Sequence, residues 1–169
     1  MLAILAPVPA EILESAFQVR NSKGIVAFGT GAIGEEKSGE WSFNFFSKSE
    51  ISDQKGEMPV LIYGSKTDVA GPHPLHDPTS VVAVGTYIGF SPAVGSGHHL
   101  HPEYRPQKAL DGDLKYSMFW EIIGLRSLVR PIPLKQLELF KQGKVTKYAG
   151  KQPIGPLLVS IPDEYADLT

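Results

Sequence analysis

The stretch Val81-Val-Ala-Val-Gly-Thr-Tyr-Ile-Gly-Phe90 decides the fold class of this chain. It is rich in β-branched and aromatic side chains, a composition typical of a strand. Gly85 and Gly89 interrupt it, and glycine inside a strand indicates a bulge or a sharp bend. We therefore expect a strand that bends strongly, as the corner of a small barrel requires.

Other segments with strand character surround this stretch, and helical segments are few. Strands are predicted at 24–28, 41–45, 59–63, 116–125 and 156–161, and short helices at 9–17 and 133–140. Strands and helices do not alternate regularly, which argues against a doubly wound sheet. The prediction is a mainly β (α+β) fold, a small and mostly antiparallel β-barrel of five to seven strands with short peripheral helices.

Length and composition favour one ordinary globular domain over residues 1–169. The chain has 169 residues, of which 42% are hydrophobic and 20% charged, and it contains no cysteine. Disulfides, thiolate metal sites and cysteine nucleophiles are therefore excluded. The apolar start lacks a basic residue and meets Pro7 and Pro9 early, so we expect neither a signal peptide nor a membrane span. A cytoplasmic location is the default expectation, and nothing indicates the oligomeric state.

Charge is unevenly distributed along the chain, although the formal net charge is only −2. The segment 105–151 carries ten basic and four acidic residues, whereas 1–104 carries six basic and eleven acidic ones. A basic segment of this kind indicates either a polyanionic partner or simply a solvated lysine-rich surface.

A glycine-rich sequence, Gly29-Thr-Gly-Ala-Ile-Gly34, matches the dinucleotide-binding pattern G-x-G-x-x-G. That pattern works only where a helix starts at the loop and directs its N-terminal amides at a pyrophosphate. The following residues 35–40 show no apolar periodicity and begin with two glutamates, which would repel a phosphate. We interpret the motif as a turn between two strands, and no cofactor is predicted.

The densest group of histidines is Gly97-His-His-Leu-His101. His99 and His101 would point to the same side of an extended segment, a spacing that suits two zinc ligands. A third ligand is not evident, and histidines next to glycine and proline are more often surface or hydrogen-bonding residues. We therefore predict no metal site, and no motif identifies catalytic residues.

Both tryptophans, Trp41 and Trp120, fall in predicted strands, with Phe43 and Phe119 close by. Aromatic rings on a barrel surface can stack an unpaired base, a contact that contributes roughly 1–3 kcal/mol per base. The alternative is that each tryptophan belongs to the hydrophobic core.

The order of these segments resembles the PUA-like superfamily, most closely its EVE-type domains, which are relatives of ASCH and YTH domains. The resemblance runs from Trp41 to the C-terminus. Its motifs are Trp41, Val60-Leu-Ile-Tyr-Gly-Ser65, Val82-Ala-Val-Gly-Thr-Tyr-Ile-Gly-Phe90, His101-Pro102 with Arg105-Pro106, Phe119-Trp120-Glu121, Pro131-Ile-Pro-Leu-Lys-Gln-Leu137 and Gly155-Pro-Leu-Leu-Val-Ser-Ile161.

The resemblance implies a pocket on the side of the barrel that holds a modified base between aromatic rings and polar groups. By motif position, Trp41 and Ser65 become candidates for this pocket. The chemistry of their side chains adds Tyr63, Trp120 and Arg105 to the candidates.

The preferred hypothesis is a module that binds nucleic acid or a modified nucleoside. Arg105, Lys108, Arg126 and Arg130 would then hold the backbone phosphates. The overall acidic balance argues against tight nonspecific binding to duplexes.

Two alternatives stay open. The first is a small ASCH-like amidohydrolase that acts on modified nucleosides, for which Lys66, Thr67, Thr86 and Glu121 are available without defining a site. The second is a scaffold domain without a small ligand.

Overall fold

The computed structural model describes residues 1–32, 36–54, 56–141, 143–148, 153 and 155–168. The strands are β1 (Leu2–Val8), β2 (Val26–Ala32), β3 (Pro59–Gly64), β4 (Ser80–Pro92), β5 (Tyr116–Pro133), β6 (Glu138–Lys141), β7 (Lys144–Lys147) and β8 (Leu157–Ser160). The α-helices are α1 (Ala10–Ala16), α2 (Glu36–Phe46), α3 (Ser49–Ser52) and α4 (Gln107–Asp111). Short 3₁₀-helices occur at Pro102–Tyr104, Leu134–Gln136 and Asp163–Leu168.

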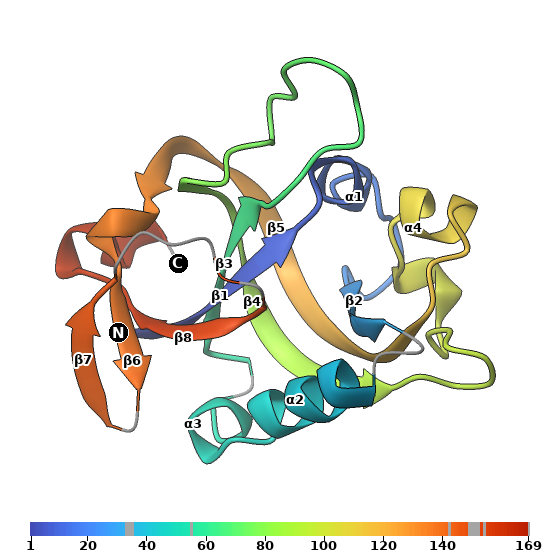
Figure 1. The fold of residues 1–169 in the computed structure, drawn as a ribbon, viewed down its shortest axis with the longest axis horizontal. Helices are drawn as coiled ribbons and strands as arrows, with labels where there is room; N and C mark the ends of the chain where they lie inside the picture. Colours follow the sequence, from blue (N-terminus) through green and yellow to red (C-terminus); the bar gives the residue numbers. More distant parts are fainter. Residues whose placement is uncertain (33–35, 55, 142, 149–152, 154, 169) are drawn as a thin grey trace.

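The strands form one sheet in the order β2-β5-β4-β3-β1-β8-β6-β7. Every neighbouring pair is antiparallel except β1 and β3, which are parallel. The prediction of a mainly β and mostly antiparallel fold with short helices is therefore confirmed. In Figure 1 the helices α2 and α3 lie at the bottom of the view, and α1 with α4 at the upper right. Side chains of α1, α2 and α3 nevertheless belong to one common core.

β1 is a central strand that the sequence reasoning missed. Its neighbours are β3 on one side and β8 on the other, and it is buried on both faces. Ile4 and Ala6 belong to the core on one face of the sheet, whereas Ala3 and Leu5 belong to the core on the other face. A strand buried on both faces has a continuous apolar sequence rather than an alternating one.

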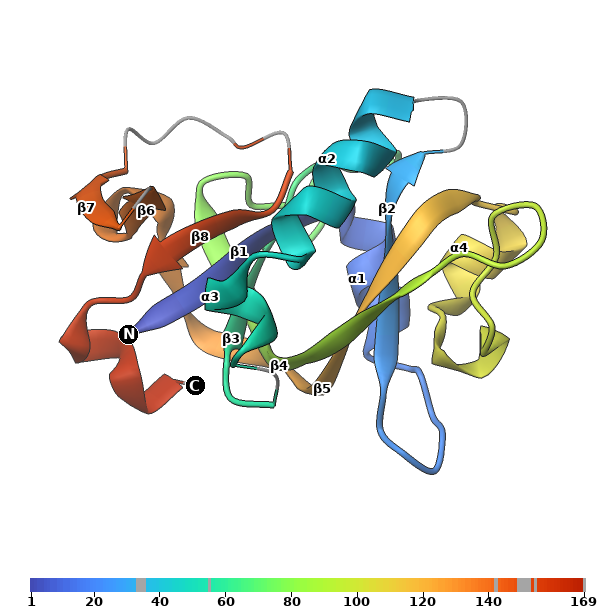
Figure 2. The ribbon, with the colours of Figure 1, turned by 90° about the horizontal axis from the view of Figure 1, so that it is seen from below.

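β4 and β5 are long and strongly bent, and Figure 2 shows them crossing beneath α2. The register between them shifts at Val84/Thr86 and at Tyr87/Gly89, so the predicted irregularities at the two glycines are confirmed. A side chain at position 85 would place its Cβ 2.8 Å from a methyl carbon of Ile122 and 3.2 Å from the carbonyl oxygen of Ile123, so glycine fits this position without displacing its neighbours.

The segment 41–45 is helical, and its prediction as a strand is wrong. It forms the end of α2, in which Ser42, Phe45 and Phe46 are buried while Trp41 and Phe43 are exposed. Buried positions three and four residues apart are the pattern of an amphipathic helix. None of the helices in the described parts of the chain is long and apolar enough to cross a membrane.

The helix predicted at 133–140 is also wrong. Only the 3₁₀ turn Leu134–Gln136 forms, and the chain then continues as β6. β6 forms hydrogen-bonded ladders with β7 and β8, and these tertiary contacts override a local helical pattern.

The glycine-rich motif lies partly in β2, which contains Gly29 and Gly31, whereas residues 33–35 lie outside the described part. The next described element is the helix α2, so the expected turn between two strands is wrong. The pairing of β2 nevertheless gives a structural reason against a dinucleotide site. β2 is antiparallel to its neighbour β5, whereas the dinucleotide fold places this motif in a parallel βαβ unit.

Candidate ligand-binding site

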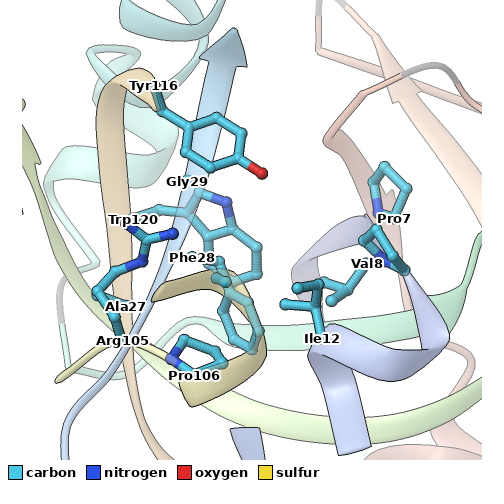
Figure 3. Close-up of a pocket in the computed structure, with 12 residues that line it drawn as sticks. Pro7, Val8, Ile12, Ala27, Phe28, Gly29, Arg105, Pro106, Tyr116 and Trp120 are labelled. Atoms are coloured by element: carbon cyan, nitrogen blue, oxygen red, sulfur yellow. The ribbon is translucent and has the colours of Figure 1, made fainter. Parts of the chain in front are cut away.

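A hollow lies between the end of β1, the start of α1 and the outer edge of β2 (Figure 3). It contains about 340 Å³ of empty space, part of which is open to solvent. Its lining residues are mostly apolar or aromatic: Pro7, Val8, Pro9, Ile12, Ala27, Phe28, Gly29, Arg105, Pro106, Ala109, Tyr116 and Trp120. The part that a water-sized sphere can occupy is only about 30 Å³, far below the roughly 300–1,000 Å³ of small-molecule sites, so a nucleoside would enter only if the lining side chains moved apart.

Arg105 contributes the only permanent positive charge among these lining residues. It is 4% exposed, and its Nε atom has no hydrogen-bond partner among the described residues. The guanidinium carbon lies 4.7 Å from the centre of the Phe119 ring and 5.6 Å from that of Tyr116. Burial lowers the pKa of Arg105, but an arginine retains its charge in proteins. A buried donor without a partner requires an explanation, and a missing ligand supplies one.

Tyr116 covers the hollow from the β5 side, and Figure 3 shows its hydroxyl directed toward the open space. Its ring lies directly over Gly29, where an added Cβ would be only 2.1 Å from a ring carbon. Gly29 is therefore needed to let the tyrosine cross β2. Burial raises the pKa of Tyr116, although the charge on Arg105 opposes this effect, so its hydroxyl is protonated at neutral pH.

Trp120 lines the hollow with the edge of its indole rather than with a free face. The ring is stacked on Phe28 at 4.7 Å and on Phe46 at 6.4 Å. Because these two contacts occupy the indole, Trp120 does not offer a flat platform for stacking a base. Figure 3 shows the indole nitrogen on the side that faces Tyr116.

The edge of β2 adds backbone polar groups to the hollow. Among the described residues, β2 is the first strand of the sheet and pairs only with β5, and its residues Ala27, Phe28 and Gly29 line the hollow in succession. Successive residues of a strand direct their N–H and C=O groups to alternate sides, so at least one of the three presents both groups to this free edge.

Three of the predicted pocket residues lie elsewhere. Trp41 is 45% exposed on α2, where it stacks on Phe45 and packs against Gly155. Tyr63 is fully buried on the other face of the sheet, where its hydroxyl donates to the carbonyl of Pro153 at 2.7 Å.

Ser65 follows β3 and is half-buried, and its backbone N–H donates to the carbonyl of Val8 at 3.0 Å. Its side chain is not among those that line the hollow. Of the four predicted base-binding residues, the structure therefore brings only Trp120 to this site.

The predicted phosphate-binding residues do not form one surface. Arg105 is buried in the hollow, Lys108 is exposed on α4, and Arg126 and Arg130 are exposed on the far part of β5. α4 and the end of β5 lie at different ends of the molecule (Figure 1). The basic character of segment 105–151 is thus spread over several surfaces.

A second polar cluster lies close to the first site. Oε1 of Glu121 accepts hydrogen bonds from Oγ of Ser91 at 3.1 Å and from Nε2 of His99 at 3.0 Å. His99 is 4% exposed, and its ring meets that of Phe119 edge-on at 5.0 Å. Phe119 is therefore in contact with both Arg105 and His99.

The position of the protons in this cluster argues against a serine nucleophile. The backbone N–H of His101 donates to Nδ1 of His99 at 2.9 Å, which assigns the proton of the neutral ring to Nε2. In a protonated ring, Nδ1 would donate to the His101 carbonyl, also at 2.9 Å. Oγ of Ser91 also lies 3.2 Å from Nε2 of His99, but with this assignment Nε2 donates to Glu121 rather than accepting the proton of Ser91 as a catalytic base would.

The residues considered for an amidohydrolase are dispersed. The hydroxyl of Thr67 donates to Glu11, whose carboxylate also accepts the N–H of Asp68 at 2.8 Å. Lys66 is exposed, and Thr86 is half-buried on β4. The hydrogen bond from Thr67 is the main cause that lowers the pKa of Glu11 to about 2.

The histidine-rich segment contributes hydrogen bonds in this structure. Among the described residues, no group of three or more His, Asp or Glu side chains converges as metal ligands would. His98 and His101 are partly exposed, whereas His99 is buried and cannot be counted as a surface residue.

No protein-family model, curated protein or solved structure matches this chain.

Proposed function

We propose that this protein is a PUA-like domain of the EVE type that binds a modified base or nucleoside in the hollow beside Arg105. The observation that carries the proposal is the buried guanidinium, which lies between aromatic rings and has a donor without a partner. A ligand that supplies an acceptor there would relieve the cost of a buried and incompletely paired charge.

The lining groups fit a planar heterocycle that carries a carbonyl oxygen. Arginine is suited to acceptors on the edge of a base, and Tyr116 adds a hydroxyl directed into the same space. The free edge of β2 offers an N–H and a C=O side by side, which complement the lactam edge of a purine or pyrimidine. Apolar side chains around the hollow, such as Ile12 and Pro106, would exclude water from these hydrogen bonds.

We further propose that the protein is cytoplasmic. Its ligand would be either a free nucleoside or a base displaced from nucleic acid. The exposed cations Lys108, Arg126 and Arg130 would supply phosphate contacts to a polynucleotide. Because these residues lie on separate elements, we expect a weak contribution from the backbone and a larger one from the base.

The test is a fluorescence titration in a Trp41→Phe background. The chain has two tryptophans, so this variant leaves Trp120 as a reporter whose edge lines the hollow. Modified and plain nucleosides and oligonucleotides are titrated at two salt concentrations. We expect a signal with a modified base, and Arg105→Met should weaken binding roughly tenfold or more because a charge-assisted hydrogen bond is lost.

The matched control is Lys108→Met, which removes an exposed cation three residues away on α4. It should leave nucleoside binding unchanged and reduce only the salt-dependent part of oligonucleotide binding. Absence of a signal with every base and oligonucleotide at low salt, in a folded sample, would contradict the proposal. It would favour the amidohydrolase or scaffold alternatives.

A further inference from the structure

The side chains around the hollow beside Arg105 supply hydrogen-bond donors and no charged acceptor. Figure 3 shows the guanidinium of Arg105 and the hydroxyl of Tyr116 directed toward the same space, with the indole nitrogen of Trp120 on the side that faces the tyrosine. A guanidinium has five N–H donors and no acceptor, and an indole N–H can only donate. Among the described residues, no acceptor forms a hydrogen bond with any of these three groups. The hollow therefore offers donors that the described part of the protein does not use.

The described residues that line the hollow carry no negative charge. Arg105 forms no ion pair with a carboxylate in the described part of the chain. Two carboxylates on adjoining segments are engaged elsewhere: Glu103 with His101 at 3.3 Å, and Glu121 with His99 at 3.0 Å. Because Arg105 is buried, its unpaired charge is unfavourable until a ligand supplies an anion.

The free space in the hollow suits a small and flat group. A water-sized sphere can occupy about 30 Å³ of it. One water molecule needs roughly 10–15 Å³ by this measure, so the space holds about two oxygen-sized atoms. A carboxylate has two oxygens in one plane and forms paired hydrogen bonds with a guanidinium. A tetrahedral phosphate, or a whole heterocycle, would enter only if the lining side chains moved apart.

We infer, on the basis of the proposed function, that the ligand is a base or nucleoside whose modification carries a carboxylate, and that this carboxylate enters the hollow. Its two oxygens would accept hydrogen bonds from Arg105 and Tyr116, with the indole N–H of Trp120 as a further donor. The ring of the base would stay in the part of the hollow that is open to solvent. This arrangement needs no displacement of the lining side chains, unlike the entry of a whole nucleoside.

The test is a calorimetric titration of the full chain with 5-carboxymethyluridine and with its neutral amide of nearly the same shape, 5-carbamoylmethyluridine. We expect the acid to bind roughly tenfold more tightly or better, because a charge-assisted pair with Arg105 is stronger than a neutral hydrogen bond. Benzoate, a flat carboxylate without a nucleoside, and inorganic phosphate are titrated at the same ionic strength. Benzoate should bind more weakly than the acid, and phosphate should not displace the acid.

Three variants of the chain test which groups hold the carboxylate. Arg105→Met should remove the preference for the acid, so that acid and amide bind with equal affinity. Tyr116→Phe keeps the ring over Gly29 but removes the hydroxyl, and it should weaken binding of the acid severalfold. Arg20→Met is the matched control, because Arg20 is exposed and is not among the lining residues of the hollow, and it should leave the preference unchanged. Circular dichroism verifies that each variant is folded.

The outcomes separate the carboxylate from the proposed function. If the amide binds as tightly as the acid, the base-binding proposal stands and the carboxylate is wrong. If benzoate binds through Arg105 while no nucleoside binds, the carboxylate site stands and the base-binding proposal is wrong. Displacement of the acid by phosphate, an unchanged preference in a folded Arg105→Met protein, or no binding of any carboxylate would overturn the inference.

Discussion

Arg105 lies against the ring of Phe119, and Glu121 is hydrogen-bonded to His99, which packs on the same ring, yet the protein treats these two opposite charges differently. Glu121 receives two hydrogen bonds on one oxygen, whereas Nε of Arg105 has no partner among the described residues. Hydrogen bonds to Glu121 tie the loop before His99 to the sheet. The guanidinium of Arg105 lies against the rings of Phe119 and Tyr116.

Under the proposed function, Glu121 serves stability, whereas Arg105 is kept for the ligand. A carboxylate that accepts two side-chain hydrogen bonds contributes to the folded state, and its removal leaves the buried donor of His99 without that acceptor. A buried charge that lacks a partner costs free energy in the free protein, so its presence indicates a use beyond folding. The following experiments test this contrast in order of expected effect.

The largest effect is expected for Gly29→Ala. The new Cβ would stand 2.1 Å from the Tyr116 ring, which must move away and open the cover over Arg105. We expect the free energy of unfolding to fall by about 3 kcal/mol, as in overpacked cores, and base binding to be lost. Urea denaturation measures the change. Gly112→Ala is the control, because its Cβ would have ordinary contacts at 3.4 Å and should change stability by less than about 0.5 kcal/mol.

Glu121→Ala should have the next largest effect. Nε2 of His99 and the hydroxyl of Ser91 would lose their common acceptor, and His99 is buried. We expect a loss of about 2 kcal/mol in the free energy of unfolding, and a smaller loss in Glu121→Gln, which retains an acceptor oxygen. Equal stability of the alanine variant and the wild type would contradict the stabilising role of Glu121.

Arg105→Met should lower stability little or even raise it. The variant replaces a buried and incompletely paired cation with an apolar side chain of similar length. We expect the free energy of unfolding without ligand to stay constant or to increase by about 1 kcal/mol. Thermal and urea unfolding measure this. A loss of more than about 2 kcal/mol would show that Arg105 serves folding as Glu121 does.

The smallest effect concerns pH and a third charged group, Glu11. Its pKa is lowered from 4.5 to about 2 in the folded state, chiefly by the hydrogen bond from Thr67. A depressed carboxyl pKa contributes stability above the pKa of the unfolded chain, and this contribution is lost as pH falls from about 4.5 toward 2. Glu11→Gln should flatten this part of the stability profile, measured by thermal unfolding between pH 2 and 6. An unchanged slope would contradict the assignment.

The strands that could be predicted are those whose local sequence already has the composition typical of a strand. β3, the centre of β4 and the start of β5 are rich in β-branched and aromatic residues and were predicted at nearly their true positions. The prediction of a strand at 41–45 failed because five residues of alternating size also fit a helix. In that helix Ser42, Phe45 and Phe46 face the core. β1 was not predicted because its apolar run was considered only as a possible targeting signal.

The candidate site was harder to predict because long-range packing assembles it. Trp120 was identified, but the aromatic neighbours Phe28 and Phe46 that occupy its faces come from distant segments. Tyr116 was missed, and its requirement for Gly29 cannot be recognised without the register between β2 and β5. Arg105 was identified as a cation, whereas its burial depends on tertiary contacts.

The great length of β5 has a consequence for how copies of the protein meet. Its pairing with β2 ends at Ile122, so from Ile123 onward one side of β5 has no neighbouring strand among the described residues. Val129 on this stretch is fully exposed. An open edge of this kind favours aggregation, and charged residues and proline are the usual protection against it. Edge-to-edge association is therefore opposed by the charges of Arg126 and Arg130 and by the rigid ring of Pro131. This role explains these three residues even if they bind no phosphate.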